Sequence, residues 1–198
     1  MTETLCLSDA VGFLIEHARK SGADAAESFG ADSLSASAEC RAGKTENLEY
    51  AHTAAVDLRV FCGGRPAVAS SSVLDKAALT ELAERAVEMA KTVPEDPYCG
   101  LAEANDQIKN QIDLDLYDDI DRSTADLLDL ALKTEDAALS VAGVKQSDGA
   151  GAGIEKSHIL MASTTGFYRE FDRSAASVSV SVIAENENGD KETDYDYS

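Results

Sequence analysis

Apolar residues near the start of the chain recur three and four positions apart. Their positions are Val11, Leu14, Ile15 and Ala18. This spacing is typical of a helix with one buried face. Ser8 is a suitable N-cap, and Arg19, Lys20 and Gly22 supply a basic last turn and a stop. We therefore predict a first helix between Ser8 and Gly22.

Two further helices are indicated by their caps. Asp75 can cap one of them, and Pro94 ends it because proline lacks an amide hydrogen. Its apolar positions are again three and four apart: Leu79, Leu82, Ala83, Ala86, Val87 and Ala90. Ser123 can cap another helix, with Asp126 in the capping-box position, and we expect that helix to run to about Ser140.

Elsewhere the period of apolar residues is two, which predicts strands. Within residues 31–72, apolar Val56, Leu58, Val60 and Cys62 alternate with Asp57, Arg59 and Phe61. Glycine-containing turns are predicted at residues 42–44 and 62–65, so several short antiparallel strands should form a meander. A second strand region follows, most clearly at Ala176, Val178, Val180, Val182 and Ala184, and residues 191–198 alternate charged and aromatic side chains.

The order of helix and then strands occurs twice, which predicts an α+β fold with helices packed on antiparallel meander sheets. Gly43 corresponds to Gly166 and Val56 to Val178, at offsets that differ by one residue, which a β-bulge would absorb. One interpretation is an internal duplication, with subunits 1–92 and 123–198 joined by an acidic linker at 93–122. The other is that any meander offers similar alternation.

No stop signal follows the alternating residues 191–198. Natural domains usually end on a frayed polar tail or a closed element. We therefore expect residues 1–198 to be the N-terminal domain of a longer protein whose C-terminal domain is absent from this chain.

Charge limits the choice of ligand. The 198 residues include 37 acidic and 17 basic side chains, a net charge of −20, so direct binding to nucleic acid is disfavoured by repulsion from phosphates. No stretch approaches the roughly 20 apolar residues that a membrane span needs, and the first residues lack the pattern of a signal peptide. We expect a soluble, cytoplasmic protein without a membrane partner.

Cysteines and histidines form no local metal motif. Their positions are Cys6, Cys40, Cys62, Cys99, His17, His52 and His158. This scatter contains neither a C-x-x-C pair nor a finger-like set, so we interpret the cysteines as reduced thiols. A metal site assembled only in three dimensions stays an open alternative.

Cys62 is the best candidate for a nucleophile, because the neighbouring residues 63 and 64 are glycines whose amides could stabilise a thiolate. Its place in the apolar alternation favours a small core residue instead. The serines at 70–72 lack a Gly-x-Ser-x-Gly elbow. His52, beside Tyr50, fits a half-exposed strand better than a catalytic site.

Two other runs resemble ligand loops only in part. The acidic run at 113–121 has Tyr117 at a calcium-ligand position and Asp118 where such a loop needs glycine, which favours a solvated linker. The glycines at 149, 151 and 153 are not followed by the Lys-Ser/Thr of a phosphate loop. They favour a close backbone approach in or beside a strand, or an edge that accepts another chain.

Four segments together resemble a known family. They are residues 58–72, the helix at 77–90, the loop Pro-Glu-Asp-Pro-Tyr-Cys-Gly-Leu at 94–101, and residues 166–174 with the Ser/Val strand after them. They are similar to the N-terminal half of the TldD/PmbA proteins, called modulators of DNA gyrase. The loop at 94–101 resembles the PmbA branch, also called TldE, more than the TldD branch.

The resemblance implies a protein that pairs with a TldD-like subunit in a heterodimeric metalloprotease complex. Such a complex acts on unfolded or flexible peptides, including peptide-antibiotic precursors during their maturation and an antitoxin. In the family, the TldD subunit binds zinc through a His-Glu-x-x-x-His helix and a distant cysteine. None of the three histidines here is followed by Glu, so no metal ligand carries over.

We therefore interpret the chain as the N-terminal domain of a non-catalytic, PmbA/TldE-like subunit, with a zinc-bearing TldD-like subunit and an unfolded peptide as partners. We assign no catalytic, cofactor-binding or metal-binding residue and no cofactor. Sheet edges at 63–69 or 149–153 could bind an extended peptide. The alternatives are a stand-alone module that binds a protein through a sheet edge, and a hydrolase that uses Cys62 or Cys99.

Overall fold

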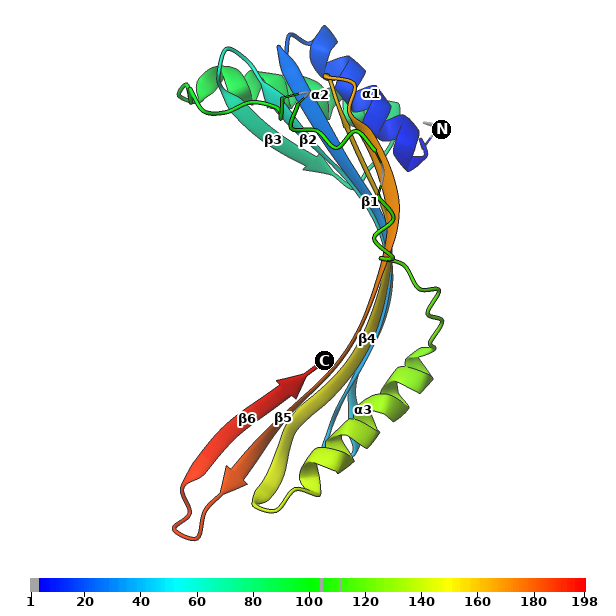
Figure 1. Cartoon of the computed structure of the whole chain (residues 1–198), viewed down its shortest axis with the longest axis vertical. Helices are drawn as coiled ribbons and strands as arrows, with labels where there is room; N and C mark the ends of the chain where they lie inside the picture. The colour runs from blue at the N-terminus through cyan, green and yellow to red at the C-terminus, as the bar shows by residue number, and fades with distance from the viewer. Residues whose placement is uncertain (1–3, 104, 111) are drawn as a thin grey trace. The chain divides into compact units, whose positions relative to one another are not determined.

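The computed structural model describes residues 4–103, 105–110 and 112–198. The helices in this part of the chain are α1 (Leu7–Lys20), α2 (Lys76–Thr92) and α3 (Thr124–Leu139). The strands are β1 (Ala25–Arg41), β2 (Lys44–Phe61), β3 (Pro66–Ser71), β4 (Val144–Ser163), β5 (Tyr168–Glu185) and β6 (Lys191–Tyr197) (Figure 1). The predicted α+β class is confirmed.

All six strands form one antiparallel sheet in the order β3-β2-β1-β4-β5-β6. The two predicted meanders are present as β1-β2-β3 and β4-β5-β6, and pairing of β1 with β4 joins them. At the edges, β2 pairs with β3 from Val56 opposite Ser71 to Phe61 opposite Pro66. At the other edge, β5 pairs with β6 from Ser179 opposite Tyr197 to Glu185 opposite Lys191.

The strands are longer than the predicted short ones. β1 has 17 residues and β2 has 18, and β1 begins at Ala25, six residues before the predicted start at position 31. Gly30 lies inside β1, where an added Cβ would be 2.9 Å from both Leu7 Cδ1 and Val11 Cγ2 of α1. Glycine therefore allows α1 to approach the sheet closely and does not end the strand there.

The first compact unit contains the chain up to Ser33 together with Thr53–Asp115 and Ser157–Asp172. Its core packs α1 and α2 against strands of the sheet, and all six predicted apolar positions of α2 are buried. Asp75 caps α2 as predicted, because its Oδ1 accepts a hydrogen bond from Ala78 N–H at 2.8 Å. The predicted cap of α1 is wrong: the N-cap is Cys6, and Ser8 lies inside the first turn.

The second compact unit contains Leu34–His52, Leu116–Lys156 and Arg173–Ser198. Its core packs α3 against the sheet through Leu127, Ala131 and alanines of β1 and β4. The predicted capping box of α3 is confirmed: Asp126 N–H donates to Ser123 Oγ at 3.1 Å, and Ser123 N–H donates to Asp126 Oδ2 at 3.0 Å. α3 thus covers one face of the sheet in this unit.

The order of one helix and three strands occurs twice, as α1-β1-β2-β3 and α3-β4-β5-β6. Each compact unit nevertheless combines three separate stretches of the chain, and β1, β2, β4 and β5 contribute to both. The internal duplication and the subunits 1–92 and 123–198 stay predictions. Among the helices in the described ranges, none has the length and apolar character needed to cross a membrane.

Candidate functional site

The turn between β2 and β3 carries Cys62, the thiol considered as a nucleophile. Cys62 is buried in the core of the first unit, with its Sγ 3.9 Å from the carbonyl oxygen of Gly22. Burial and, after it, the negative charge of Asp24 raise the pKa of the Cys62 thiol. A raised pKa keeps the sulfur protonated, which is the opposite of an activated nucleophile. The structure therefore favours the core interpretation of Cys62.

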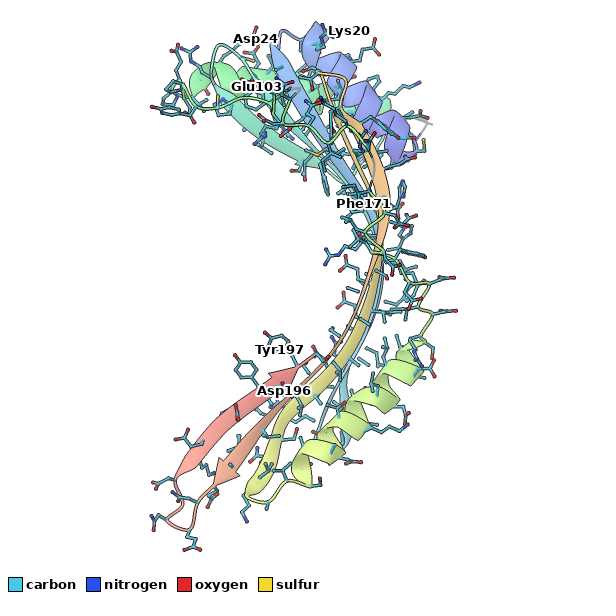
Figure 2. The ribbon with its side chains drawn as sticks, viewed as in Figure 1. Lys20, Asp24, Glu103, Phe171, Asp196 and Tyr197 are labelled. Carbon is cyan, nitrogen blue, oxygen red and sulfur yellow. The ribbon has the colours of Figure 1, made fainter. Side chains whose placement is uncertain are left out.

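The first of the two glycines after Cys62 binds a carboxylate of the chain itself. Gly63 and Gly64 have φ values of 57° and 71°, in the left-handed region that glycine adopts without steric cost. Gly63 N–H donates a hydrogen bond to Asp24 Oδ2 at 2.6 Å. Asp24, labelled in Figure 2, comes just before β1. The anion bound at this turn is thus Asp24 and not a thiolate.

The loop that carries Cys99 packs on the same turn. Asp96 N–H donates to the Gly64 carbonyl oxygen at 2.8 Å, and Cys99 Sγ donates to the same oxygen at 3.3 Å. The side chain of Tyr98, between these two contacts, is 95% exposed. The loop is therefore fixed against the first unit while it presents a tyrosine to solvent.

The three histidines lie on separate elements. His17 stacks on Phe13 within α1 with ring centroids 5.2 Å apart, and His52 is exposed on β2. His158 Nδ1 on β4 lies 2.8 Å from Asp172 Oδ1 on β5. Among the described residues, no group of three or more His, Cys, Asp or Glu side chains is placed to hold a metal ion.

β3 is an outer strand of the sheet and offers main-chain groups at its free edge. Cys62 and Arg65 exchange both of their main-chain hydrogen bonds across the turn, at 3.0 and 3.2 Å. Because bonded pairs alternate along an antiparallel ladder, the register points the main chain of Ala67, Ala69 and Ser71 toward β2. The N–H and C=O groups of Val68 and Ser70 therefore point outward.

The glycines at 149, 151 and 153 lie in β4, which is an inner strand between β1 and β5. The expectation that they form an edge open to another chain is therefore wrong. A Cβ on Gly151 would lie 3.7 Å from the Ala38 carbonyl oxygen, and one on Gly153 would lie 3.5 Å from that of Ala36. These are ordinary van der Waals distances, so the expected close backbone approach is not found at Gly151 and Gly153, and the extended strand does not form a phosphate loop.

The face of the second unit opposite α3 is lined by small residues and two tyrosines. Ala150, Ala152 and Ile154 pack in the core beneath α3, so the alternating glycines of β4 lie on the opposite face, beside Ser177 and Ser179. Tyr197 pairs with Ser179 in register and therefore shares this face, as Figure 2 shows. Its ring stacks on that of Tyr195, with centroids 6.4 Å apart.

Glu135 on α3 is a buried carboxylate that the sequence pattern did not single out. It accepts hydrogen bonds from Ala42 N–H at 2.8 Å and from Gly43 N–H at 2.7 Å, in the turn between β1 and β2. Burial raises the pKa of Glu135, but hydrogen bonds from Ser147, Gly43 and Ala42 outweigh it and leave the pKa lowered. The ionised side chain therefore fastens the turn to α3. The sequence does indicate the burial of Glu135, because Leu127, Ala131 and Glu135 follow one another at intervals of four residues on the apolar face of α3.

The predicted solvated linker is held along β5. Ser174 N–H donates to the Leu116 carbonyl oxygen at 3.0 Å, and Asp118 N–H donates to Ser174 Oγ at 2.8 Å. Lys156 Nζ of β4 lies 2.7 Å from Asp119 Oδ1. β6 pairs with the later part of β5, from Ser179 to Glu185, and the linker bonds to the earlier part of β5 at Ser174. The acidic run at 113–121 thus has a defined attachment to the sheet.

Two models of one protein family match the chain in order. The model described as PmbA/TldA metallopeptidase domain 1 matches residues 26–90, and the central domain of the same family matches residues 117–198. The Metalloprotease PmbA homolog of Haemophilus influenzae is 32% identical over 194 residues, which cover 97% of this chain and 42% of that protein. Metalloprotease PmbA of Escherichia coli O157:H7 is 30% identical over 195 residues, with the same coverage. The chain belongs to the TldD/PmbA family.

Solved structures share the fold. A candidate modulator of DNA gyrase from Bacteroides thetaiotaomicron has a TM-score of 0.85 and 21% identity, over 96% of this chain and 44% of that one. TldE from Thermococcus kodakarensis has a TM-score of 0.75 and 17% identity, over 96% of this chain and 42% of that one. The chain thus spans less than half the length of the relatives that it matches.

The family description implies a metal ion, which in a peptidase is held by several converging side chains. His17, His52 and His158 do not converge, and Cys40 and Cys62 are buried in separate cores. Within the described ranges, these residues do not fit such a site.

Proposed function

We propose that this chain is the N-terminal part of a PmbA/TldE-like, non-catalytic subunit of a cytoplasmic metalloprotease complex. Its partner is a TldD-like subunit that carries the zinc, and the complex processes or degrades unfolded peptides. The observation that supports this most strongly is the ordered match to domain 1 and the central domain of one family, together with relatives named PmbA that align over 97% of the chain.

The non-catalytic role is proposed from the resemblance to the PmbA branch of the family. The resemblance places zinc binding in a His-Glu-x-x-x-His helix of the TldD subunit. In this chain His17 is followed by Ala, His52 by Thr and His158 by Ile. The loop at 94–101 adds support for the PmbA branch. The role of this chain is then to position a peptide and to contact the partner.

The free edge of β3 supports peptide binding without sequence preference. An extended peptide can add to a sheet edge through main-chain hydrogen bonds, which do not depend on its side chains. The outward N–H and C=O groups of Val68 and Ser70 provide these bonds. The same edge favours a second candidate function, a stand-alone module that binds an extended segment of a protein and needs no zinc-bearing partner.

Peptide cleavage distinguishes the two functions. The full-length protein that carries this chain and the TldD-like subunit of the same organism are purified separately and then mixed with a fluorescent unstructured peptide. We expect cleavage in the mixture and none with the protein that carries this chain alone. Cleavage by that protein alone would contradict the non-catalytic role, and absence of any complex in the mixture would favour the stand-alone module.

The role of the β3 edge is tested with Val68→Pro in the same assay. Proline at this position removes only an outward N–H, which outer strands tolerate. We expect slower cleavage by the complex, with Val68→Ala as the control that keeps the amide. Unchanged cleavage by a folded Val68→Pro variant would refute peptide binding at β3.

A further inference from the structure

β6 is an outer strand of the sheet, and every residue in it is exposed. Its acidic side chains alternate with Thr193, Tyr195 and Tyr197, and the exposed fractions of the two tyrosines are 72% and 75%. An outer strand presents N–H and C=O groups that have no partner strand, and tyrosine favours extended backbone. Such an edge is a template for the addition of another strand, including β6 of a second copy of the chain.

The ladder between β5 and β6 shows which main-chain groups of β6 face outward. Val178 and Ser198 exchange both of their main-chain hydrogen bonds, at 3.0 and 2.9 Å. Bonded pairs recur at every second residue of an antiparallel ladder, so the main chains of Asp194 and Asp196 bond to β5. The N–H and C=O groups of the two tyrosines therefore point to the free edge.

The outward amides of both tyrosines are already bonded within the chain. Tyr195 N–H donates to Asp194 Oδ1 at 2.9 Å, and Tyr197 N–H donates to Asp196 Oδ1 at 2.9 Å. Asp196 and Tyr197 are labelled in Figure 2. A strand that adds to β6 needs these N–H groups for its own carbonyl oxygens, so both bonds to the carboxylates must first break. Hydrogen bonds to a charged acceptor are about twice as strong as neutral ones.

The outward residues of β3 have different neighbours. These residues are Val68 and Ser70, and they follow Ala67 and Ala69, whose side chains have no hydrogen-bond acceptor. A cap from the preceding side chain therefore cannot form at β3. The two outer strands thus differ in how their outward amides are satisfied.

We infer that Asp194 and Asp196 close the free edge of β6 against the addition of another strand, and in particular against β6 of a second copy of the chain. The two carboxylates do so by bonding the outward amides of Tyr195 and Tyr197, and their repulsive charge is the smaller part of the effect. Extended segments then add to β3 and not to β6. Closure of β6 does not require the TldD-like partner, so it stands even if the proposed pairing fails.

The test measures self-association of the full-length protein that carries this chain, by sedimentation equilibrium at about 0.5 M salt, which screens the repulsion between acidic copies. The alanine variant combines Asp194→Ala with Asp196→Ala. The asparagine variant combines Asp194→Asn with Asp196→Asn, which removes the same charge but keeps an oxygen acceptor.

The control variant combines Glu187→Ala with Glu192→Ala. It removes the same charge from the same hairpin, and in the described part of the chain neither glutamate caps an outward amide. Circular dichroism checks that every variant is folded.

We expect the alanine variant to associate at least about tenfold more tightly than the wild type, because the two carboxylate bonds in each copy no longer have to break. The asparagine variant should gain only about threefold, since a neutral acceptor keeps about half of the bond strength. The control variant should associate as the wild type does. Adding Tyr195→Pro to the alanine variant should abolish its gain, because proline removes an outward N–H and outer strands tolerate it.

Three results would overturn the inference. The first is an alanine variant that associates no more tightly than the wild type. The second is an equal gain in the alanine and asparagine variants, or in the control variant, which would assign the protection to charge. The third is a gain that survives Tyr195→Pro, which would place the contact away from the main-chain edge of β6.

Discussion

Replacing Glu135 by glutamine should destabilise the second unit, although the two side chains have nearly the same shape. The carboxylate accepts hydrogen bonds from two amides, at 2.8 Å from Ala42 N and 2.7 Å from Gly43 N. Glutamine has one carbonyl oxygen for these two donors, and its NH₂ group must then face the second amide. One hydrogen bond to a charged group is lost, and two donors are brought together.

The expected loss follows from the strength of such bonds. A hydrogen bond to a charged group contributes about 1.5–3 kcal/mol net, so we expect Glu135→Gln to lower the free energy of unfolding by about 2–3 kcal/mol. For a chain of this length, this corresponds to a fall in Tm of about 4–12 °C. Urea unfolding followed by circular dichroism measures the first quantity. Hydrogen exchange should show faster opening of the turn between β1 and β2.

The matched control is Asp136→Asn, which removes the same charge at the next position of α3, where the side chain is exposed. We expect it to change stability by less than about 0.5 kcal/mol. A Glu135→Gln variant that is as stable as this control would refute the reasoning.

The same contact predicts a dependence on pH. The folded-state pKa of Glu135 lies below its ordinary value of 4.5, so the stabilisation is present above that value and is lost as the pH falls through the folded-state pKa. The difference in stability between wild type and Glu135→Gln should therefore be full at neutral pH and shrink below about pH 4.5. A difference that stays constant down to the acid unfolding of the protein would show that the ionised carboxylate is not its cause.

Three further predictions concern local features. Cys6 is exposed, whereas Cys62 is buried and has a raised pKa. Iodoacetamide at neutral pH should therefore label Cys6 at least about tenfold faster than Cys62, as mass spectrometry can measure. Equal rates would contradict the assignment of Cys62 to the core. Gly149 has a φ of 131°, so Gly149→Ala should lower the free energy of unfolding by about 1–2 kcal/mol, as thermal unfolding can measure. Gly151→Ala, with ordinary contacts around its Cβ, should lower it by less than about 0.5 kcal/mol. Equal losses in the two variants would refute the strain argument. Ser123→Ala removes the cap of α3 and should cost about 1 kcal/mol in urea unfolding, and an unchanged midpoint would show that the cap contributes nothing.

Local features of the fold could be predicted because local chemistry determines them. Asp75 and the pair Ser123 and Asp126 act as caps through bonds to residues three positions away, which a sequence pattern contains. The turn at Ala42 and Gly43 needs positive φ at both residues, which the glycine partly signals. The predicted N-cap of α1 is wrong because the actual N-cap, Cys6, makes no cap hydrogen bond through its side chain. A residue that caps a helix without such a bond cannot be identified from its side-chain chemistry.

The pairing of β1 with β4 could not be predicted, because it joins segments more than a hundred residues apart and has no turn of its own. The inner position of Gly149 and its neighbours in β4 depends on that pairing, so the expectation of an open edge failed with it. The burial of Cys62, in contrast, follows from the alternation of apolar residues along β2, which continues into the turn after it. The role of Glu135 depends on amides of a distant hairpin, so the sequence indicates only its place on the apolar face of α3.

The central claim is that this chain contributes contacts to a reaction whose zinc is held by another subunit. The most direct test is the mass, by light scattering, of the species formed when the full-length protein that carries this chain is mixed with the TldD-like subunit of its organism. We predict a complex that contains both chains. Separate elution of the two proteins, each at its own mass, would contradict the account.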